Sequence, residues 1–190
     1  MSSNPKTYLT PEQYLATERK ADYKSEYIDG EMVAMTGASR NHNLITINTA
    51  RELTQQLKGK PCEAYSSDMR VRIPATNLYA YPDLVVVCRE PIFEDDFVDT
   101  LVNPTAIIEV LSDSTESYDR GKKFRVYRSI NSLSEYLLIA QDEYRVEQYI
   151  KQLDGRWLLS EARSINDQIE LSSIDCTLTL KEIYDKVKLP

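Results

Sequence analysis

YPDLVVV at residues 81–87 and AIIEVL at residues 106–111 are the two segments that decide the fold of this chain. Both are hydrophobic runs without polar alternation, which is typical of central strands covered on both faces. Each run contains one carboxylate, Asp83 in the first and Glu109 in the second. Because an unpaired carboxylate is unfavourable inside a protein, we expect both side chains to have partners, and a metal ion is a candidate partner.

The remaining hydrophobic pattern alternates short strands with a few helices. Helices are expected over residues 10–19, from 39 or 41 to 58, over 115–129 and from 179 onward. Further strands are expected over 25–28, 31–35, 69–73, 135–140, 144–152, 156–162 and 169–171. Asp-Gly pairs at 29–30 and 154–155 suit the tight turns of two hairpins, one toward each end of the chain. This order predicts a mixed α/β fold with extra N-terminal and C-terminal hairpins, rather than a strict βαβ repeat.

Length and charge limit the class of protein. A chain of 190 residues suits one domain with a substantial core, so we expect a single domain over residues 1–190. The net charge of −7 counts against strong nonspecific binding of nucleic acid, but it does not exclude a nuclease with a local basic face. Arg70, Arg72 and the basic residues of 120–128 are candidates for such a face, and the alternative is that they are simply solvated.

Cysteine and histidine usage narrows the choice of metal. Cys62, Cys88 and Cys176 are far apart and odd in number, so we expect no disulfide framework. Cys88 is expected to be a small buried hydrophobe. With His42 as the only histidine of the sequence, a zinc site is disfavoured. Oxygen ligands would have to hold any metal, which indicates Mg²⁺ or Mn²⁺.

The sequence does not predict export or membrane insertion. Residues 1–10 are polar, so we expect no signal peptide. The apolar runs fall well short of the roughly 20 residues that a membrane span needs. The expected location is therefore the cytoplasm, without a membrane partner.

Asp83, Glu109 and a lysine that follows them suggest hydrolysis of a phosphodiester. This reaction needs oxygen ligands that hold a cation at the scissile phosphate, an activated water molecule, and positive charge for the transition state. Asp83 and Glu109 would supply ligands from neighbouring strands, and the backbone carbonyl of Val110 could add another. Lys123, fourteen residues after Glu109 in a helix-like stretch, would orient the water or stabilise the transition state.

Several short motifs together resemble the Uma-two family of endonucleases. They are Pro82-Asp83, IEVLS at 108–112, DRGKKF at 119–124 with Tyr127, Glu135-Tyr136, the turn Asp29-Gly30-Glu31 with Met35, and NHN at 41–43. The resemblance covers residues from about 9 to 185, the expected core of the domain. That family belongs to the PD-(D/E)XK, restriction-endonuclease-like superfamily. The resemblance therefore implies a central mixed sheet flanked by helices, with Asp83 and Glu109 as metal ligands.

The lysine is where this sequence departs from the simplest pattern of the superfamily. Leu111 occupies the position at which a lysine would complete Glu-x-Lys. In the family the lysine looks displaced to the following helix, which here implies Lys123, with the adjacent Lys122 as the alternative. Asp119 precedes Lys123 by four residues, so the two share a helix face and Asp119 is expected to hold the lysine in place.

Three more residues are candidates for a supporting role in the site. The family pattern gives Glu31 a role as an extra metal ligand or in holding a water molecule, although a residue after a hairpin turn is usually exposed. His42 lies near a helix N-terminus, where capping or packing is the more frequent role and lining the site is the alternative. Tyr127, four residues after Lys123, is expected to pack rather than to take part in catalysis.

These observations lead to three hypotheses about function. The first is a Mg²⁺-dependent endonuclease that hydrolyses DNA. The second is a catalytically inactive module of the same fold that binds nucleic acid or protein, and the third is a nuclease that acts on RNA. The intact set of Asp83, Glu109 and Lys123 favours an enzyme. Superfamily members often pair, so the resemblance also implies a homodimer.

Overall fold

The computed structural model of the protein describes residues 8–112 and 116–190. Residues 1–7, on which part of the signal-peptide expectation rests, lie outside the described residues, as do residues 113–115, which include the expected start of a helix. In the described part of the chain, none of the helices has the length and apolar character that crossing a bilayer requires.

Helices and strands follow one another in the mixed order that the sequence predicts. The helical elements are α1 (Pro11–Glu18), α2 (Arg40–Leu57), a 3₁₀ turn η1 (Pro74–Thr76), α3 (Glu116–Tyr118), a π-helical turn η2 (Asp119–Lys123), α4 (Phe124–Tyr127) and α5 (Leu180–Ile183). The strands are β1 (Ser25–Ile28), β2 (Glu31–Ala34), β3 (Cys62–Ser66), β4 (Arg70–Ile73), β5 (Leu78–Ala80), β6 (Leu84–Cys88), β7 (Thr100–Leu101), β8 (Ala106–Val110), β9 (Glu135–Ile139), β10 (Val146–Lys151), β11 (Trp157–Ala162), β12 (Gln168–Leu171) and β13 (Cys176–Thr179).

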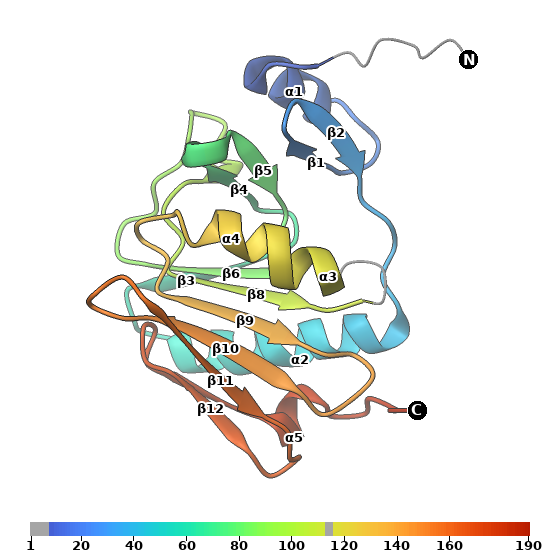
Figure 1. Ribbon diagram of the computed structural model, residues 1–190, viewed down its shortest axis with the longest axis vertical. Coiled ribbons are helices and arrows are strands. Elements are labelled where there is room, and N and C mark those ends of the chain that lie inside the picture. The colour runs from blue at the N-terminus through green and yellow to red at the C-terminus, as the bar shows by residue number, and fades with distance from the viewer. Residues whose placement is uncertain (1–7, 113–115) are drawn as a thin grey trace.

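Two larger sheets and one small hairpin make up the β-structure. The first sheet has the order β11-β10-β9-β8-β6-β3, and the second has the order β2-β1-β5-β4-β7. Both are mixed, because β8 pairs with β9 and β4 pairs with β7 in parallel while the other neighbours are antiparallel. The two expected hairpins each extend a larger sheet: β1–β2 forms one edge of the second sheet, and β10–β11 forms one edge of the first (Figure 1).

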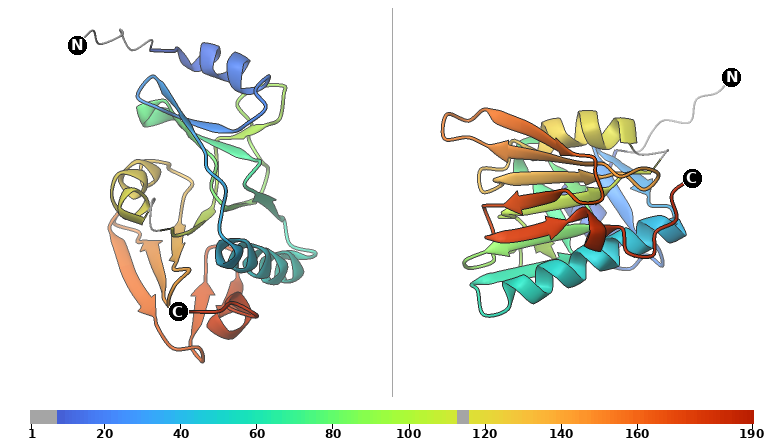
Figure 2. Two further views of the ribbon diagram at one scale, coloured as in Figure 1. Left: turned by 90° about the vertical axis from the view of Figure 1, so that its right-hand side faces the viewer. Right: turned by 90° about the horizontal axis from the view of Figure 1, so that it is seen from below.

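The six-stranded sheet is covered on both faces, which confirms the expectation for the two hydrophobic runs. Figure 2 shows α2 on one side of it and the α3–α4 segment on the other. Strand β8 alternates between the two layers. Ile108 packs in the layer that includes α2, and Ile107 packs in the layer that includes α4. Glu109 has the same parity as Ile107, so its side chain lies on the α3–α4 side.

Local signals in the sequence set the beginnings of several elements. Thr10 caps α1 in a reciprocal capping box with Gln13, and Pro11 occupies the first helical position. Ser39 caps α2 by accepting a hydrogen bond from the backbone of His42. In the β1–β2 turn both central residues have positive φ, 51° at Asp29 and 91° at Gly30, as a type I′ turn requires.

Strands β3, β5, β7 and β13 were not predicted, and two reasons account for the first three. Strands β5 and β7 contain three and two residues, too few for a periodic pattern. Strand β3 has no hydrophobic alternation, and it is held by its full-length pairing with the buried strand β6. Tertiary pairing rather than intrinsic preference forms these strands.

A disulfide joins Cys62 and Cys88, so the expectation that the cysteines form no disulfide framework was wrong, and Cys88 is a half-buried disulfide partner rather than a small buried hydrophobe. The two residues face each other directly in the antiparallel pair of β3 and β6, although 26 positions separate them in the sequence. Because β3 was not predicted, nothing in the sequence brought Cys62 opposite the end of the Asp83 strand. Cys176 is free and buried.

Buried charge anchors the second sheet to the N-terminal helix. Arg70, at the start of β4, is 3% exposed and its Nη2 lies 2.6 Å from Oδ2 of Asp99. Arg19, which follows α1, donates to both carboxylate oxygens of Asp99 at 2.8 Å. Hydrogen bonds from Arg19, together with the charge of Arg70, hold the pKa of Asp99 well below its usual range. Asp99 therefore links α1 to the sheet that carries the β1–β2 hairpin.

We predict that Asp99 contributes stability that acid removes. A carboxyl whose pKa is lower in the folded state stabilises the fold above its unfolded pKa, and this contribution is lost as the pH falls through the folded value. Asp99→Asn should lower the free energy of unfolding at pH 7 by about 1–3 kcal/mol. It should also reduce the loss of stability between pH 5 and pH 3, measured by urea unfolding. Asp96→Asn, at an exposed position of the same loop, is the matched control; equal behaviour of the two variants would contradict the prediction.

Candidate active site

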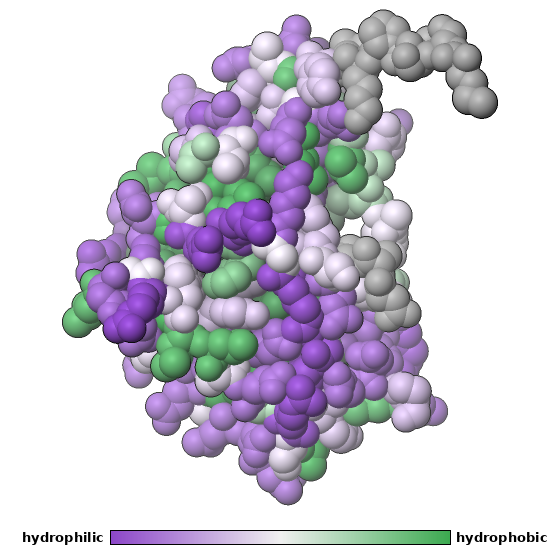
Figure 3. Space-filling view, in the orientation of Figure 1, coloured by the Kyte–Doolittle hydropathy of each residue, from purple (hydrophilic) through white to green (hydrophobic). Residues whose placement is uncertain are grey.

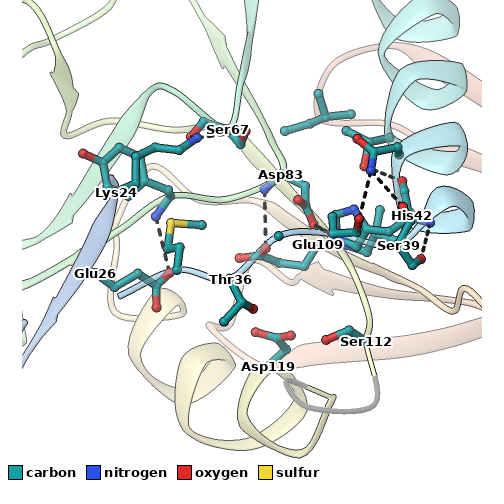
Figure 4. A pocket seen from close by; sticks show the side chains of 18 of the residues that line it. Lys24, Glu26, Thr36, Ser39, His42, Ser67, Asp83, Glu109, Ser112 and Asp119 are labelled. Atoms are coloured by element: carbon teal, nitrogen blue, oxygen red, sulfur yellow. Dashed lines mark hydrogen bonds and ion pairs between the residues drawn. The ribbon is translucent and has the colours of Figure 1, made fainter. Parts of the chain in front are cut away.

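A cavity of about 960 Å³ lies where the two larger sheets meet. Its walls come from β1 and β2, from the connection between β2 and α2, and from the first turns of α2. The start of β6, the end of β8 and the α3–η2 segment complete it. Figure 4 shows that the labelled side chains lining this cavity include Glu26, Asp83, Glu109 and Asp119. The cavity therefore collects carboxylates from four separate segments of the chain.

Backbone N–H groups of the two neighbouring segments hold the side chains of Asp83 and Glu109 side by side. The backbone N–H of Val110 donates to Oδ2 of Asp83 at 2.8 Å, and the backbone N–H of Asp83 faces Oε2 of Glu109 at 3.4 Å. This exchange is possible because β6 and β8 are antiparallel neighbours, with Leu84 opposite Ile108. The carboxylates that the sequence places 26 residues apart are thus brought together at one end of two adjoining strands.

Lys123 reaches the same point from the helical side and is buried. Its Nζ lies 2.8 Å from Oε1 of Glu109 and 3.2 Å from Oε1 of Glu26. A third carboxylate, that of Asp119, lies 3.6 Å from the same nitrogen, as the four-residue spacing predicts. The hydroxyl of Tyr127 also donates to Oε1 of Glu109, at 3.1 Å. Lys123 is therefore the central cation of a carboxylate cluster.

A π-helical turn decides which of the two adjacent lysines faces the site. The predicted α-helix is interrupted at η2, where the backbone N–H of Phe124 donates to the carbonyl of Asp119, five residues earlier. The wider turn leaves Lys123 buried under the helix. Lys122 is exposed instead and forms an ion pair with Asp29, 3.0 Å away. Single π-turns of this kind are frequent at functional sites.

Burial and charge act against each other on Glu109 and Lys123. Burial raises the pKa of Glu109 to about 8, although the ammonium of Lys123 opposes this. Burial alone would lower the pKa of Lys123, but the carboxylates of Glu109, Glu26 and Asp119 raise it well above its ordinary value. The lysine therefore stays charged, and the surplus of carboxylates gives the site a demand for further positive charge.

The supporting residues suggested by the sequence have different positions. His42 lines the cavity, with Nε2 3.2 Å from Oδ2 of Asp83. Asp119 and Val110 line it as well. Tyr127 is fully buried behind Glu109, where it packs and donates the hydrogen bond described above. Glu31, in the register of β2 opposite Ile28, is outside the set of described residues that line the cavity.

Sequence reasoning did not single out Glu26 and Tyr118, two residues of the cavity wall with buried polar groups. Glu26 is buried, and its short strand, Ser25–Ile28, contains an otherwise uncharged buried run. A carboxylate within a buried hydrophobic run is the signal that identified Asp83 and Glu109. A strand of four residues beside a hairpin turn is too short for this signal to be recognised in the sequence. Tyr118 has a buried hydroxyl without a hydrogen-bond partner among the described residues, and burial raises its pKa to about 12. The sequence contains no sign of this.

The donor set of the cavity fits a small, hard cation. Two neighbouring carboxylates and a backbone carbonyl are oxygen donors, and Mg²⁺ in phosphate-processing sites typically takes one or two carboxylates while substrate oxygens and water complete its shell. Among the described residues, no three His, Cys, Asp or Glu side chains form a ready-made metal cage. The arrangement therefore suits a cation that arrives with a phosphate.

The fold is that of the nuclease-like mixed α/β proteins. The chain matches a crystal structure from Anabaena variabilis, described as that of a "putative nuclease", with a TM-score of 0.78. The match covers 95% of this chain and 99% of the other, at 18% sequence identity, which shows a likeness of fold.

The family follows from the sequence model that matches residues 11–181. The chain belongs to the Uma2 family, whose description is "Putative restriction endonuclease". Two uncharacterised proteins of Synechocystis sp. are similar to it. One is 44% identical over 164 residues, covering 86% of this chain and 93% of its own length, and the other is 37% identical over 182 residues, covering 96% and 94%.

Replacing Lys123 should destabilise the fold, because the buried carboxylates around it lose their cation. Lys123→Met is expected to lower the free energy of unfolding at pH 7 by about 3–5 kcal/mol, because Glu109 and Glu26 lose their cation. Without Lys123, the folded pKa of Glu109 rises further above its unfolded value, so the deficit should grow as the pH rises above about 8, the folded pKa in the wild type. Urea unfolding at pH 7 and at higher pH measures both effects.

Two variants serve as controls for this prediction. Lys122→Met changes the exposed neighbour and should alter stability by no more than about 0.5 kcal/mol. Adding Glu109→Gln to Lys123→Met should recover part of the lost stability, since it removes one of the buried charges. A Lys123→Met protein as stable as the wild type would contradict the buried cluster.

Proposed function

We propose that this protein is a metal-dependent endonuclease that hydrolyses phosphodiester bonds in DNA. The observation that carries the proposal is the convergence of Asp83, Glu109 and Lys123 in one cavity, from the residue before β6, from β8 and from η2. Membership of the Uma2 family supports the reaction class. The acidic character of the cavity suits a site that receives a phosphate only together with a cation.

The residues of the cavity have different roles in hydrolysis. Asp83, Glu109 and the carbonyl of Val110 would hold Mg²⁺ or Mn²⁺, which supplies positive charge at the scissile phosphate and favours ionisation of a bound water molecule. Lys123 adds a fixed cation next to Glu109, where it stabilises charge that develops on the phosphate oxygens. Asp119 and Glu26 keep Lys123 charged and in place. His42 holds Asp83 through the contact of its Nε2 with Oδ2.

DNA as the substrate and a pair of identical chains as the working form are parts of the same proposal. They rest on the family's description as restriction endonucleases and on the frequent pairing of the superfamily. RNA remains the natural comparison substrate, because the cavity residues named above act on the phosphate, which both nucleic acids share.

The assay is cleavage of supercoiled plasmid, single-stranded DNA and RNA in Mg²⁺, in Mn²⁺ and in chelator. Wild-type protein should cut DNA with either metal and lose activity in chelator. Asp83→Asn and Lys123→Ala should each reduce the rate by on the order of 100-fold or more. The exposed Lys122 provides a matched control, and Lys122→Ala should stay within about twofold of the wild type.

Two results would count against the proposal. Equal cleavage by wild type and Asp83→Asn would assign the activity to a contaminant. Loss of activity in Lys122→Ala, with full activity in Lys123→Ala, would show that the catalytic lysine is Lys122 and not Lys123. Cleavage of RNA alone would keep the reaction and change the substrate.

A further inference from the structure

The connection between β2 and α2 crosses the cavity as a strap, defined here as residues 35–39 (MTGAS). All its residues are exposed, although they also line the cavity. The strap is tied at both ends: Met35 donates its N–H to the carbonyl of Lys24, and Ser39 caps α2. A Cβ built on Gly37 would meet nothing within 4 Å. Figure 2 shows this connection running from the second sheet to α2.

The space beneath the strap is too narrow for a double helix. Five residues from Met35 to Ser39 span at most about 14 Å between their end Cα atoms, even when fully extended. The major and minor grooves of a duplex are about 8.5 and 7.5 Å deep, so the duplex is at least about 16 Å across and does not fit beneath a chain of that length. Figure 4 shows the strap, which carries Thr36, passing across the cavity that contains Glu109 and Asp119. A single strand is thin enough to lie there.

One wall of the same cavity is unexpectedly apolar for a phosphate site. Val33 is 47% exposed and Ile47 is 63% exposed, and both line the cavity together with the half-buried Ile28. In Figure 3, hydrophobic surface gathers at the end of the β1–β2 hairpin, next to the hollow that the strap crosses. A phosphodiester backbone gains nothing from such a wall. The faces of unpaired bases do, because they are apolar and lose contact with water there.

Positive charge lies beyond the α2 end of the strap. Arg40 follows the strap directly, and its Nη2 donates to the carbonyl of Lys186. The neighbouring Asn41 donates to the carbonyl of Lys188, so the C-terminal segment runs beside the first turn of α2. Arg40, Lys186 and Lys188 are exposed. A strand that leaves the cavity at this end would place its phosphates near three cations, which matches the charge of a nucleic-acid backbone.

We propose that this cavity takes an unpaired strand of nucleic acid, with bases against Val33 and Ile47 and the backbone over Asp83 and Glu109. The inference rests on the proposed nuclease function for the role of the carboxylates. It goes beyond that function by naming the substrate class as single-stranded DNA or RNA, or an unpaired segment of a duplex. Duplex without an unpaired segment does not pass beneath the strap.

Binding without cleavage tests the proposal. Fluorescein-labelled oligonucleotides of one sequence, as single-stranded DNA, single-stranded RNA and fully paired duplex, are titrated with the protein in Ca²⁺, which also takes carboxylate ligands and supplies the cation that the acidic cavity needs, and anisotropy gives the dissociation constants. At least one unpaired strand should bind more tightly than the duplex. Ile47→Ser should weaken that binding by about 5- to 10-fold, because one base face loses its apolar contact.

Leu158→Ser is the matched control for Ile47→Ser. Leu158 is 56% exposed on β11 and is not among the described residues that line the cavity, so its replacement should leave binding unchanged. Duplex that binds as tightly as both single strands would overturn the proposal, and so would equal affinities of the two variants. Because cleavage is not measured, a protein that binds as expected but never cuts would sink the nuclease function alone.

Discussion

The buried contact between Lys123 and Glu109 is the interaction on which the rest of the site depends. Glu109 lies near the end of a strand covered on both faces, where a carboxylate is tolerated only with a cation beside it. That cation comes from the helical segment that covers β8, so the segment has to pack at one height and in one orientation. Tyr127, a few residues further on, adds a hydrogen bond to the same oxygen. The same contacts therefore stabilise the fold and hold the site residues in place.

The displaced lysine has a structural explanation in the packing of β8. Leu111 has the same parity as Ile107 and Glu109, and it is buried among Tyr127 and Ile130 under the helical segment. A lysine at 111 would thus leave the covering segment without an apolar contact. In this chain the apolar contact stays on the strand and the cation moves to the helix. The π-turn at η2 then places Lys123, rather than Lys122, beneath the segment.

The cavity exists because two sheets meet. The six-stranded sheet supplies Asp83 and Glu109, whereas the five-stranded sheet supplies Glu26 through β1. The chain crosses between the two sheets in the strap, which covers the opening instead of packing on either sheet. The anchoring of the second sheet through Arg70 and Asp99 therefore bears on the shape of the site, although neither residue lines the cavity.

The sequence alone determined the two central strands, their carboxylates, the main helices and the family, because long hydrophobic runs and ordered motifs are local properties. It did not reveal β3, the Cys62–Cys88 disulfide or the part played by Glu26, since each depends on a partner distant in the chain. The choice between Lys122 and Lys123 was open for the same reason. Both adjacent residues are lysines, and the sequence does not show which of them the helical turn directs into the cavity. Tertiary structure decided that direction, because burying Lys123 among three carboxylates offsets the cost of desolvating all four charges.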